Sequence, residues 1–260
     1  MIEVYLYLTG LLTVPSHSVQ KPNVVALSSQ EAQWVRLATA TNNLANANTP
    51  GFKSHLVKLI NTTQKGKEGR VVHFVSANKS LRNVADGSYR QTGNPLDVSL
   101  SGNGYFMVQT SKGNKLTRNG QFALNNNGEL VTATGAYKVL NQGNSPITIP
   151  KGVKSIVIHG HGGVYADTVL VGKIGVFSVN DQQEQLRSLG DNLLDPGKQQ
   201  LAISSKYYVK QFGLEDSNVS SVKESILMIE ILRQFEHAQK IIDEHEQSSK
   251  KILNVSTKNV

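Results

Sequence analysis

The feature that most constrains the fold is a pair of apolar stripes at opposite ends of the chain. In residues 25–46 and 220–254, side chains recur at alternating spacings of three and four, the heptad pattern of helices that pack side by side. The seam positions are Leu27, Gln30, Trp34, Leu37, Thr41 and Leu44 in the first helix, and Met228, Ile231, Phe235, Ala238, Ile242, His245, Ser249 and Ile252 in the second. Because neither helix can bury its stripe alone, we expect the two to pair with each other or with copies in neighbouring subunits.

The middle of the chain has the pattern of short strands separated by turns. Turn signals such as Gly102-Asn103-Gly104, Asn119-Gly120 and Asn127-Gly128 punctuate it, and 22 glycines in the chain agree with many turns. The expected strands are Asp97–Leu100, Tyr105–Gln109, Phe122–Leu124, Glu129–Thr132, Tyr137–Leu140, Ile147–Ile149, 153–158, 169–179, Leu201–Ile203 and Tyr207–Lys210.

These patterns predict a mixed α and β fold with a discontinuous helical domain. We expect a central Gly-rich antiparallel β domain flanked by long N- and C-terminal amphipathic helices that pair in a coiled-coil-like inner domain. The expected divisions are an N-terminal extension of unknown role (1–24), the helical inner domain (25–52 plus 220–254), a basic extended connector (53–90), the β domain (91–219) and a tail (255–260).

The stretch TNNLANANTPGFK ends the first helix in an unusual way. Asn43 and Asn46 suit a helix terminus because asparagine tolerates the left-handed conformation, and Thr49-Pro50-Gly51 then stops the helix and turns the chain. We expect this exit to be built from Asn42, Asn43, Leu44, Ala45, Asn46, Thr49, Pro50, Gly51 and Phe52.

The net charge of +8 is concentrated in residues 53–90. Eight basic and two acidic residues lie there, and only Phe74 and Tyr89 could serve as stacking platforms for a nucleic acid. The stretch is therefore interpreted as a solvated basic connector, with a polyanion-binding surface as the alternative.

Catalytic and metal-binding patterns are weak in this sequence. The chain has no cysteine, and it contains neither a nucleophile elbow, a His-Glu-x-x-His pair nor a phosphate-binding loop. His159 and His161 could share one face of a strand and meet one ion with Asp167, but the neighbouring Gly162-Gly163 favours a turn. We therefore expect no enzyme, no cofactor and no metal site.

Four ordered stretches resemble the bacterial flagellar rod and hook protein family. The first is Asn42–Lys53. The second comprises Thr92–Val98 with Gly102–Phe106, and the third comprises Thr117–Phe122 with Asn127–Val131. The fourth is Leu214–Val219, followed by Arg233-Gln234-Phe235-Glu236. Within this family the chain is most similar to the proximal rod members, with distal rod or hook-type members as the alternative. The features that indicate this are its modest length, the short connection from Phe52 to the central motifs, and Asp243-Glu244 late in the last helix.

The resemblance implies a structural role in the rod of the flagellar basal body, which crosses the periplasm. It implies axial assembly through the terminal helices, with other rod proteins and possibly further copies as partners and no direct membrane insertion. It also implies export by the flagellar type III apparatus without a cleaved signal peptide.

Overall fold

A computed structural model describes residues 21–65, 71–179 and 186–258 of the chain. The described residues form two compact units, and each is considered by itself. The helical unit holds residues 21–36, 59–78 and 230–258, and the β unit holds residues 37–58 and 79–229. Residues 21–24 of the expected extension belong to the first helix and residues 255–258 of the expected tail to the last one, whereas 1–20 and 259–260 lie outside the described residues.

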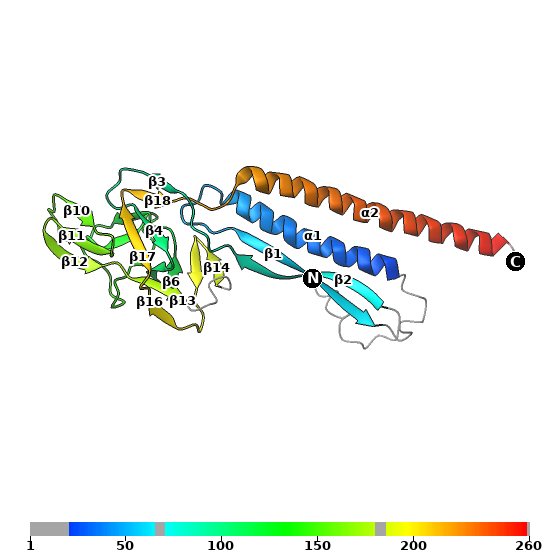
Figure 1. Cartoon of the computed structure of the whole chain (residues 1–260), viewed down its shortest axis with the longest axis horizontal. Helices are drawn as coiled ribbons and strands as arrows, with labels where there is room; N and C mark the ends of the chain where they lie inside the picture. Colours follow the sequence, from blue (N-terminus) through cyan, green and yellow to red (C-terminus); the bar gives the residue numbers. More distant parts are fainter. Residues whose placement is uncertain (1–20, 66–70, 180–185, 259–260) are drawn as a thin grey trace. The chain divides into compact units, whose positions relative to one another are not determined.

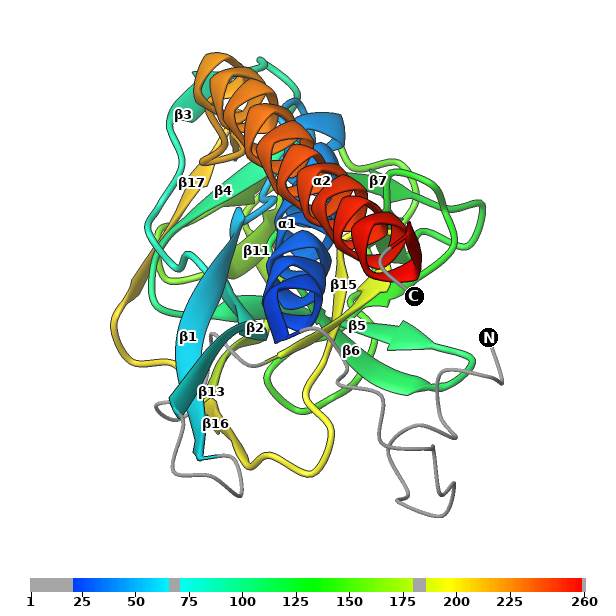
Figure 2. The same cartoon turned by 90° about the vertical axis from the view of Figure 1, so that its right-hand side faces the viewer.

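Two long helices give the helical unit its form and also contribute their inner ends to the β unit. Helix α1 spans Lys21–Ala45 and α2 spans Ser221–Lys258, so α2 is about 57 Å long at 1.5 Å per residue. The two helices run side by side in both views (Figure 1, Figure 2). Glu224 lies in the first turn of α2, where a carboxylate interacts favourably with the helix dipole. The predicted pair of terminal helices is therefore confirmed.

The β unit is built from many short antiparallel strands, as the alternation of strand and turn signals predicts. Its largest sheet has the strand order β14-β15-β6-β5-β9-β8-β7, and β13 joins it by pairing with both β5 and β16. The members of this sheet are β5 (Tyr105–Thr110), β6 (Gly113–Thr117), β7 (Phe122–Leu124), β8 (Leu130–Thr132), β9 (Lys138–Val139), β13 (Val176–Val179), β14 (Arg187–Gly190), β15 (Leu193–Asp195) and β16 (Leu201–Ile203).

Three smaller sheets complete the β unit. Strands β10 (Ile156–Ile158), β11 (Gly163–Ala166) and β12 (Val169–Lys173) form a meander. The other two sheets each join an early strand to a late one: β4 (Val98–Gly102) pairs with β17 (Tyr207–Gln211), and β3 (Tyr89–Gln91) pairs with β18 (Gly213–Glu215). These long-range pairs bring the chain back to the start of α2.

Two clusters of buried apolar side chains support these sheets. In the larger cluster Phe106 and Phe122 pack edge to face with ring centroids 5.3 Å apart. The same cluster contains fully buried aliphatic side chains from strands and from the segments between them, including Leu100, Leu130, Ile147 and Ile174. Strand β5 buries both faces, because Phe106 and Val108 lie in this cluster while Tyr105 and Met107 lie in the second one.

The segment expected as a basic connector contains two paired strands. Strand β1 spans His55–Lys65 and β2 spans Val71–Arg82, and together they form a two-stranded sheet. Two of the basic residues in this stretch are buried rather than solvated, because Lys53 is 5% exposed and Arg82 is 3% exposed. Among the described residues, neither helix carries an apolar stretch that could cross a membrane.

Candidate functional site

Four charged side chains meet inside the β unit, close to where α1 leads into it and where its last strand leads out to α2. We call Lys53, Asp86, Arg118 and Glu215 the ionic junction. Lys53 follows the turn after α1, Asp86 lies between β2 and β3, Arg118 follows β6, and Glu215 ends β18. Four distant parts of the sequence are thus held at one point.

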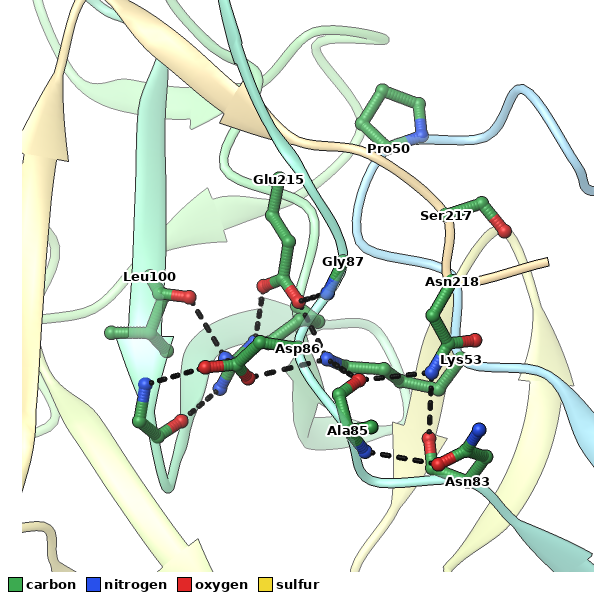
Figure 3. Close-up of polar contacts among 12 residues, drawn as sticks. Pro50, Lys53, Asn83, Ala85, Asp86, Gly87, Leu100, Glu215, Ser217 and Asn218 are labelled. Atoms are coloured by element: carbon green, nitrogen blue, oxygen red, sulfur yellow. Dashed lines mark hydrogen bonds and ion pairs between the residues drawn. The ribbon is translucent and has the colours of Figure 1, made fainter. Parts of the chain in front are cut away.

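Glu215 is the centre of the ionic junction. Its Oε1 accepts hydrogen bonds from Lys53 Nζ at 2.5 Å and from the backbone N–H of Gly87 at 3.0 Å. Its Oε2 accepts from Arg118 Nε at 2.6 Å. Figure 3 shows the carboxylate of Glu215 facing Gly87 and the end of the Lys53 side chain. Charge-assisted hydrogen bonds of this kind are about twice as strong as neutral ones.

Arg118 uses all five N–H donors of its guanidinium group. Besides Glu215, it donates to the carbonyl oxygens of Gly102 (2.8 Å), Gly104 (2.6 Å) and Leu100 (2.8 Å), and to Asp86 Oδ1 (2.8 Å). The planar guanidinium group therefore holds the carbonyl groups of the β4–β5 turn and also binds two carboxylates. A lysine could not satisfy this set of acceptors.

The ionic junction is buried but electrically balanced. The side chains of Lys53, Arg118 and Glu215 are 4%, 4% and 3% exposed, whereas Asp86 is 41% exposed. Two cations and two carboxylates leave no net charge, so the desolvation of each ion is offset by its partners. Asp86 also accepts from the backbone N–H of Gly102 at 3.0 Å, which holds its carboxylate in place.

Asparagine amides extend these contacts to both helices. Asn218 Oδ1 accepts from the backbone N–H of Ser54 (2.7 Å), and its Nδ2 donates to the carbonyl oxygens of Asn83 (3.1 Å) and Ala85 (2.9 Å). The Asn43 amide exchanges two hydrogen bonds with the backbone of His55, each 2.8 Å long. Its Nδ2 also donates to Glu224 Oε1 at 3.1 Å, so the end of α1 is tied to the start of α2.

Gly51 shows why the helix exit needs a glycine. Its φ of +68° is in the left-handed region, and a Cβ atom there would lie 2.5 Å from the backbone carbon of Arg118. Its N–H donates to the carbonyl oxygen of Glu215 at 2.7 Å, and Pro50 O accepts from Asn192 Nδ2 at 2.7 Å. Backbone contacts therefore pack the turn after α1 against the ionic junction.

The other predicted residues of the helix exit lie in the terminal turn itself. Asn46 N bonds the carbonyl oxygen of Asn42 at 3.2 Å, and Thr49 Oγ1 donates to Asn46 Oδ1 at 3.2 Å. Phe52 is buried, Leu44 is half-buried, and Ala45 is exposed. The structure thus brings the exit residues together in one turn that leads directly to Lys53.

A small pocket beside the ionic junction contains groups whose pKa values are shifted by burial. Burial lowers the pKa of His55, with a smaller contribution from the positive charge of Arg82. Burial likewise raises the pKa of Tyr105, and it lowers the pKa of the Arg82 guanidinium, which donates to Leu186 O at 3.0 Å. The rest of the lining comprises Gly51, Phe52, Lys53, Arg118, Ser188, Asn192 and Leu194. These shifts have a structural cause and indicate no acid–base pair.

The predicted helix-packing residues divide into buried and exposed positions. Ile231 and Ala238 are buried, and Leu37, Met228, Phe235 and Ile242 are half-buried. Leu27 and Trp34 are 62% and 59% exposed, although the Trp34 ring meets Phe235 edge to face at 5.6 Å between centroids. On α1 the buried positions Ala26, Gln33 and Ala40 lie one residue before Leu27, Trp34 and Thr41.

The histidine pair lies away from these contacts. His159 and His161 are exposed, with rings stacked 5.8 Å apart between centroids, and Tyr165 meets His159 edge to face. The carboxylate of Asp167 accepts from the backbone N–H groups of Lys154 and Ser155. Within the described ranges, no cluster of three or more His, Cys, Asp or Glu could hold a metal ion.

Comparison with protein-family models gives three matches in order along the chain. Residues 25–53 match the model of the flagella basal body rod protein, and residues 99–166 match the flagellar hook protein FlgE/F/G D1 domain. Residues 210–255 match the flagellar basal body rod FlgEFG protein C-terminal model. The three segments supply Lys53, Arg118 and Glu215 respectively, so the ionic junction is where they meet.

Curated relatives cover nearly the whole chain. The flagellar basal-body rod protein FlgF of Rhizobium meliloti is 32% identical over 231 residues, which span 88% of this chain and 95% of the relative. FlgF of Caulobacter vibrioides is 34% identical over 229 residues (84% and 91%), and FlgG of Agrobacterium fabrum is 31% identical over 248 residues (84% and 92%).

The chain therefore belongs to the flagellar basal-body rod protein family, as its motifs predict. It is a structural component of the rod of the bacterial flagellum, and within the family it is FlgF-like. A polyanion-binding role is not favoured, and the burial of Lys53 and Arg82 removes two of the cations on which that alternative depended.

Proposed function

We propose that this chain assembles axially in the rod through its terminal helices, which form a coiled-coil-like inner layer. In this proposal residues 25–52 and 220–254 act as one discontinuous inner domain, and residues 91–219 form the outer β domain. The partners are other rod proteins and copies of the same chain.

The observation that carries the proposal is a second apolar stripe on α2. Val222, Ile226 and Ile229 are 70%, 53% and 53% exposed, and they recur at the spacing of one helix face. This face is distinct from the seam that contains Met228, Ile231 and Phe235, since a step of 100° per residue places the two about 150° apart. The second stripe is therefore left for a neighbouring molecule.

The free energy gained by burying this stripe favours assembly in which each subunit contacts several neighbours. Burying the exposed part of each side chain is worth about 1–2 kcal/mol, or roughly 3–6 kcal/mol for the three. Association of two molecules costs about 4–15 kcal/mol in lost freedom of motion. One such contact cannot hold a subunit, whereas head-to-tail contacts that do not close build an open helical assembly in which each subunit has many neighbours.

Ile226→Asp tests the proposal because it places a charge in the second stripe without changing the core. We expect a folded β unit and normal secretion but no incorporation into isolated basal bodies, and therefore loss of motility. The matched control is Lys223→Asp, which adds the same side chain to the polar flank of the same turn. Normal basal bodies with Ile226→Asp, or equal defects in both variants, would contradict the proposal.

The finer placement also belongs to this proposal. The FlgF-like character supports a proximal position in the rod, which crosses the periplasm, and a non-catalytic role. Export through the flagellar type III apparatus without cleavage predicts that the protein recovered from basal bodies has the mass of the uncleaved chain. A shortened mature N-terminus would contradict this route.

A further inference from the structure

Three large apolar side chains lie together on one side of the helix pair in the helical unit. On this side Gln30 Nε2 donates to Gln239 Oε1 at 3.0 Å. A step of 100° per residue places Leu27 and Trp34 within about 60° of Gln30 on α1. Leu232 lies seven residues before Gln239 and therefore on the same face of α2. We call Leu27, Trp34 and Leu232 the apolar flank.

The apolar flank is exposed in the single chain. Leu27 is 62% exposed, Trp34 is 59% exposed and Leu232 is 47% exposed. The Trp34 ring meets Phe235 edge to face at 5.6 Å between centroids, so the ring has a packing partner although more than half of its surface faces solvent. Tryptophan is among the residues that most often supply the binding energy of protein interfaces. The apolar flank therefore has the composition of a binding surface.

We infer that the apolar flank of one copy of this chain binds the second stripe of the next copy in the rod. A helix that binds an apolar surface presents anchors at spacings such as i, i+4 and i+7, which is the spacing of Val222, Ile226 and Ile229. Among the described helices this is the one set of three exposed large apolar side chains with that spacing. The inference rests on the proposed function, because it names the surface that covers the second stripe.

The second stripe cannot reach the apolar flank of its own chain. Ile229 and Leu232 are three residues apart in one continuous helix, so the two surfaces can meet only between molecules. Their lengths match, because Val222 to Ile229 and Leu27 to Trp34 each advance seven residues, or about 10.5 Å along the helix axis. Their contact buries six large apolar side chains rather than three, so the gain approaches the loss of freedom on association. Two different surfaces on each chain also give the head-to-tail contact that an open assembly needs.

Cross-linking in isolated basal bodies tests this contact, since the chain has no cysteine of its own. Leu27→Cys is combined in one chain with Val222→Cys or with Ile229→Cys, because the stripe can lie in either direction along the flank. We expect a short bismaleimide to give a ladder of linked chains in one of the two double variants, and no linked chains in the single variants. Dimers from Val222→Cys or Ile229→Cys alone would show that the stripe meets itself. No links in either double variant would show that the stripe meets another protein, and each of these results would overturn the inference.

Matched charge substitutions on α2 give a second test. We expect Leu232→Asp to prevent incorporation into basal bodies and Ile241→Asp to leave it normal, with unchanged helical circular dichroism in both. Ile241 is similarly exposed, at 56%, but it lies seven residues after Gln234, which accepts a hydrogen bond from Arg36. Arg36 is about 120° from Gln30 on α1, so Ile241 is on the opposite side of the helix pair. Equal incorporation of the two variants would overturn the inference, whereas normal incorporation of the stripe variant described above would contradict the proposed function itself.

Discussion

Replacing Glu215 by glutamine is expected to destabilise the β unit strongly, because it removes the negative charge between two buried cations. Lys53 and Arg118 would keep only Asp86 as a carboxylate partner, at 3.5 Å and 2.8 Å. Breaking a buried ion pair by removing one partner costs about 3–5 kcal/mol. Since Asp86 is 41% exposed and admits water to one side, we expect the lower end, about 3 kcal/mol.

The chain offers a clean assay for this loss. All six tyrosines of the described residues lie in the β unit, whereas Trp34 lies in the helical unit, so near-ultraviolet circular dichroism of tyrosine follows the β unit. For a unit of this size, about 3 kcal/mol corresponds to a fall of roughly 6–12 °C in the melting temperature.

The neighbouring residue provides a matched control. Asp216 pairs with Arg90 at 2.8 Å, but both side chains are partly exposed (33% and 50%), so Asp216→Asn is expected to cost less than about 1 kcal/mol. Adding Lys53→Met to Glu215→Gln removes one unpaired cation, and the double variant should lose less than the sum of the single losses. A Glu215→Gln protein that melts within about 2 °C of the parent would refute the role of the ionic junction.

Two further predictions concern the same region. Gly51→Ala should destabilise the β unit by more than about 1 kcal/mol in urea unfolding, because alanine is strained at φ +68° and its Cβ meets Arg118; an equal effect of Pro50→Ala would argue against this cause. The pKa of His55 is lower in the folded protein than its ordinary value of 6.5, so its contribution to stability is complete above pH 6.5 and is lost as the pH falls toward the folded-state pKa. His55→Gln should therefore reduce the pH dependence of the unfolding free energy in that window, and an unchanged dependence would show that other groups cause it.

The sequence predicts the regular parts of this fold well because their signals are local. The expected helices 25–46 and 220–254 correspond to Lys21–Ala45 and Ser221–Lys258, and the strands Phe122–Leu124 and Leu201–Ile203 have the expected bounds. The sequence does not predict the pair of strands β1 and β2, because the lysines of this stretch indicate a charged connector. The run Val71–Val75, rich in strand-forming residues, was the signal that could have revealed it.

The ionic junction could not be derived from local pattern. Lys53, Arg118 and Glu215 all lie in the recognised motifs, but their contacts join residues 97 to 162 positions apart. A count of charges treats Lys53 as a surface cation, whereas in the fold its ammonium group is buried against the carboxylate of Glu215. The buried face of α1 is equally hard to read, because heptad analysis favours Leu27 and Trp34 over the small or amphipathic Ala26 and Gln33.

The position of Glu215 near the far end of the sequence has a consequence for unfinished molecules. A polypeptide that stops short of it leaves Lys53 and Arg118 with Asp86 as their one carboxylate partner in the ionic junction, so two cations share a single negative charge. The centre of the β unit therefore acquires its full set of ion pairs only once the chain extends through residue 215.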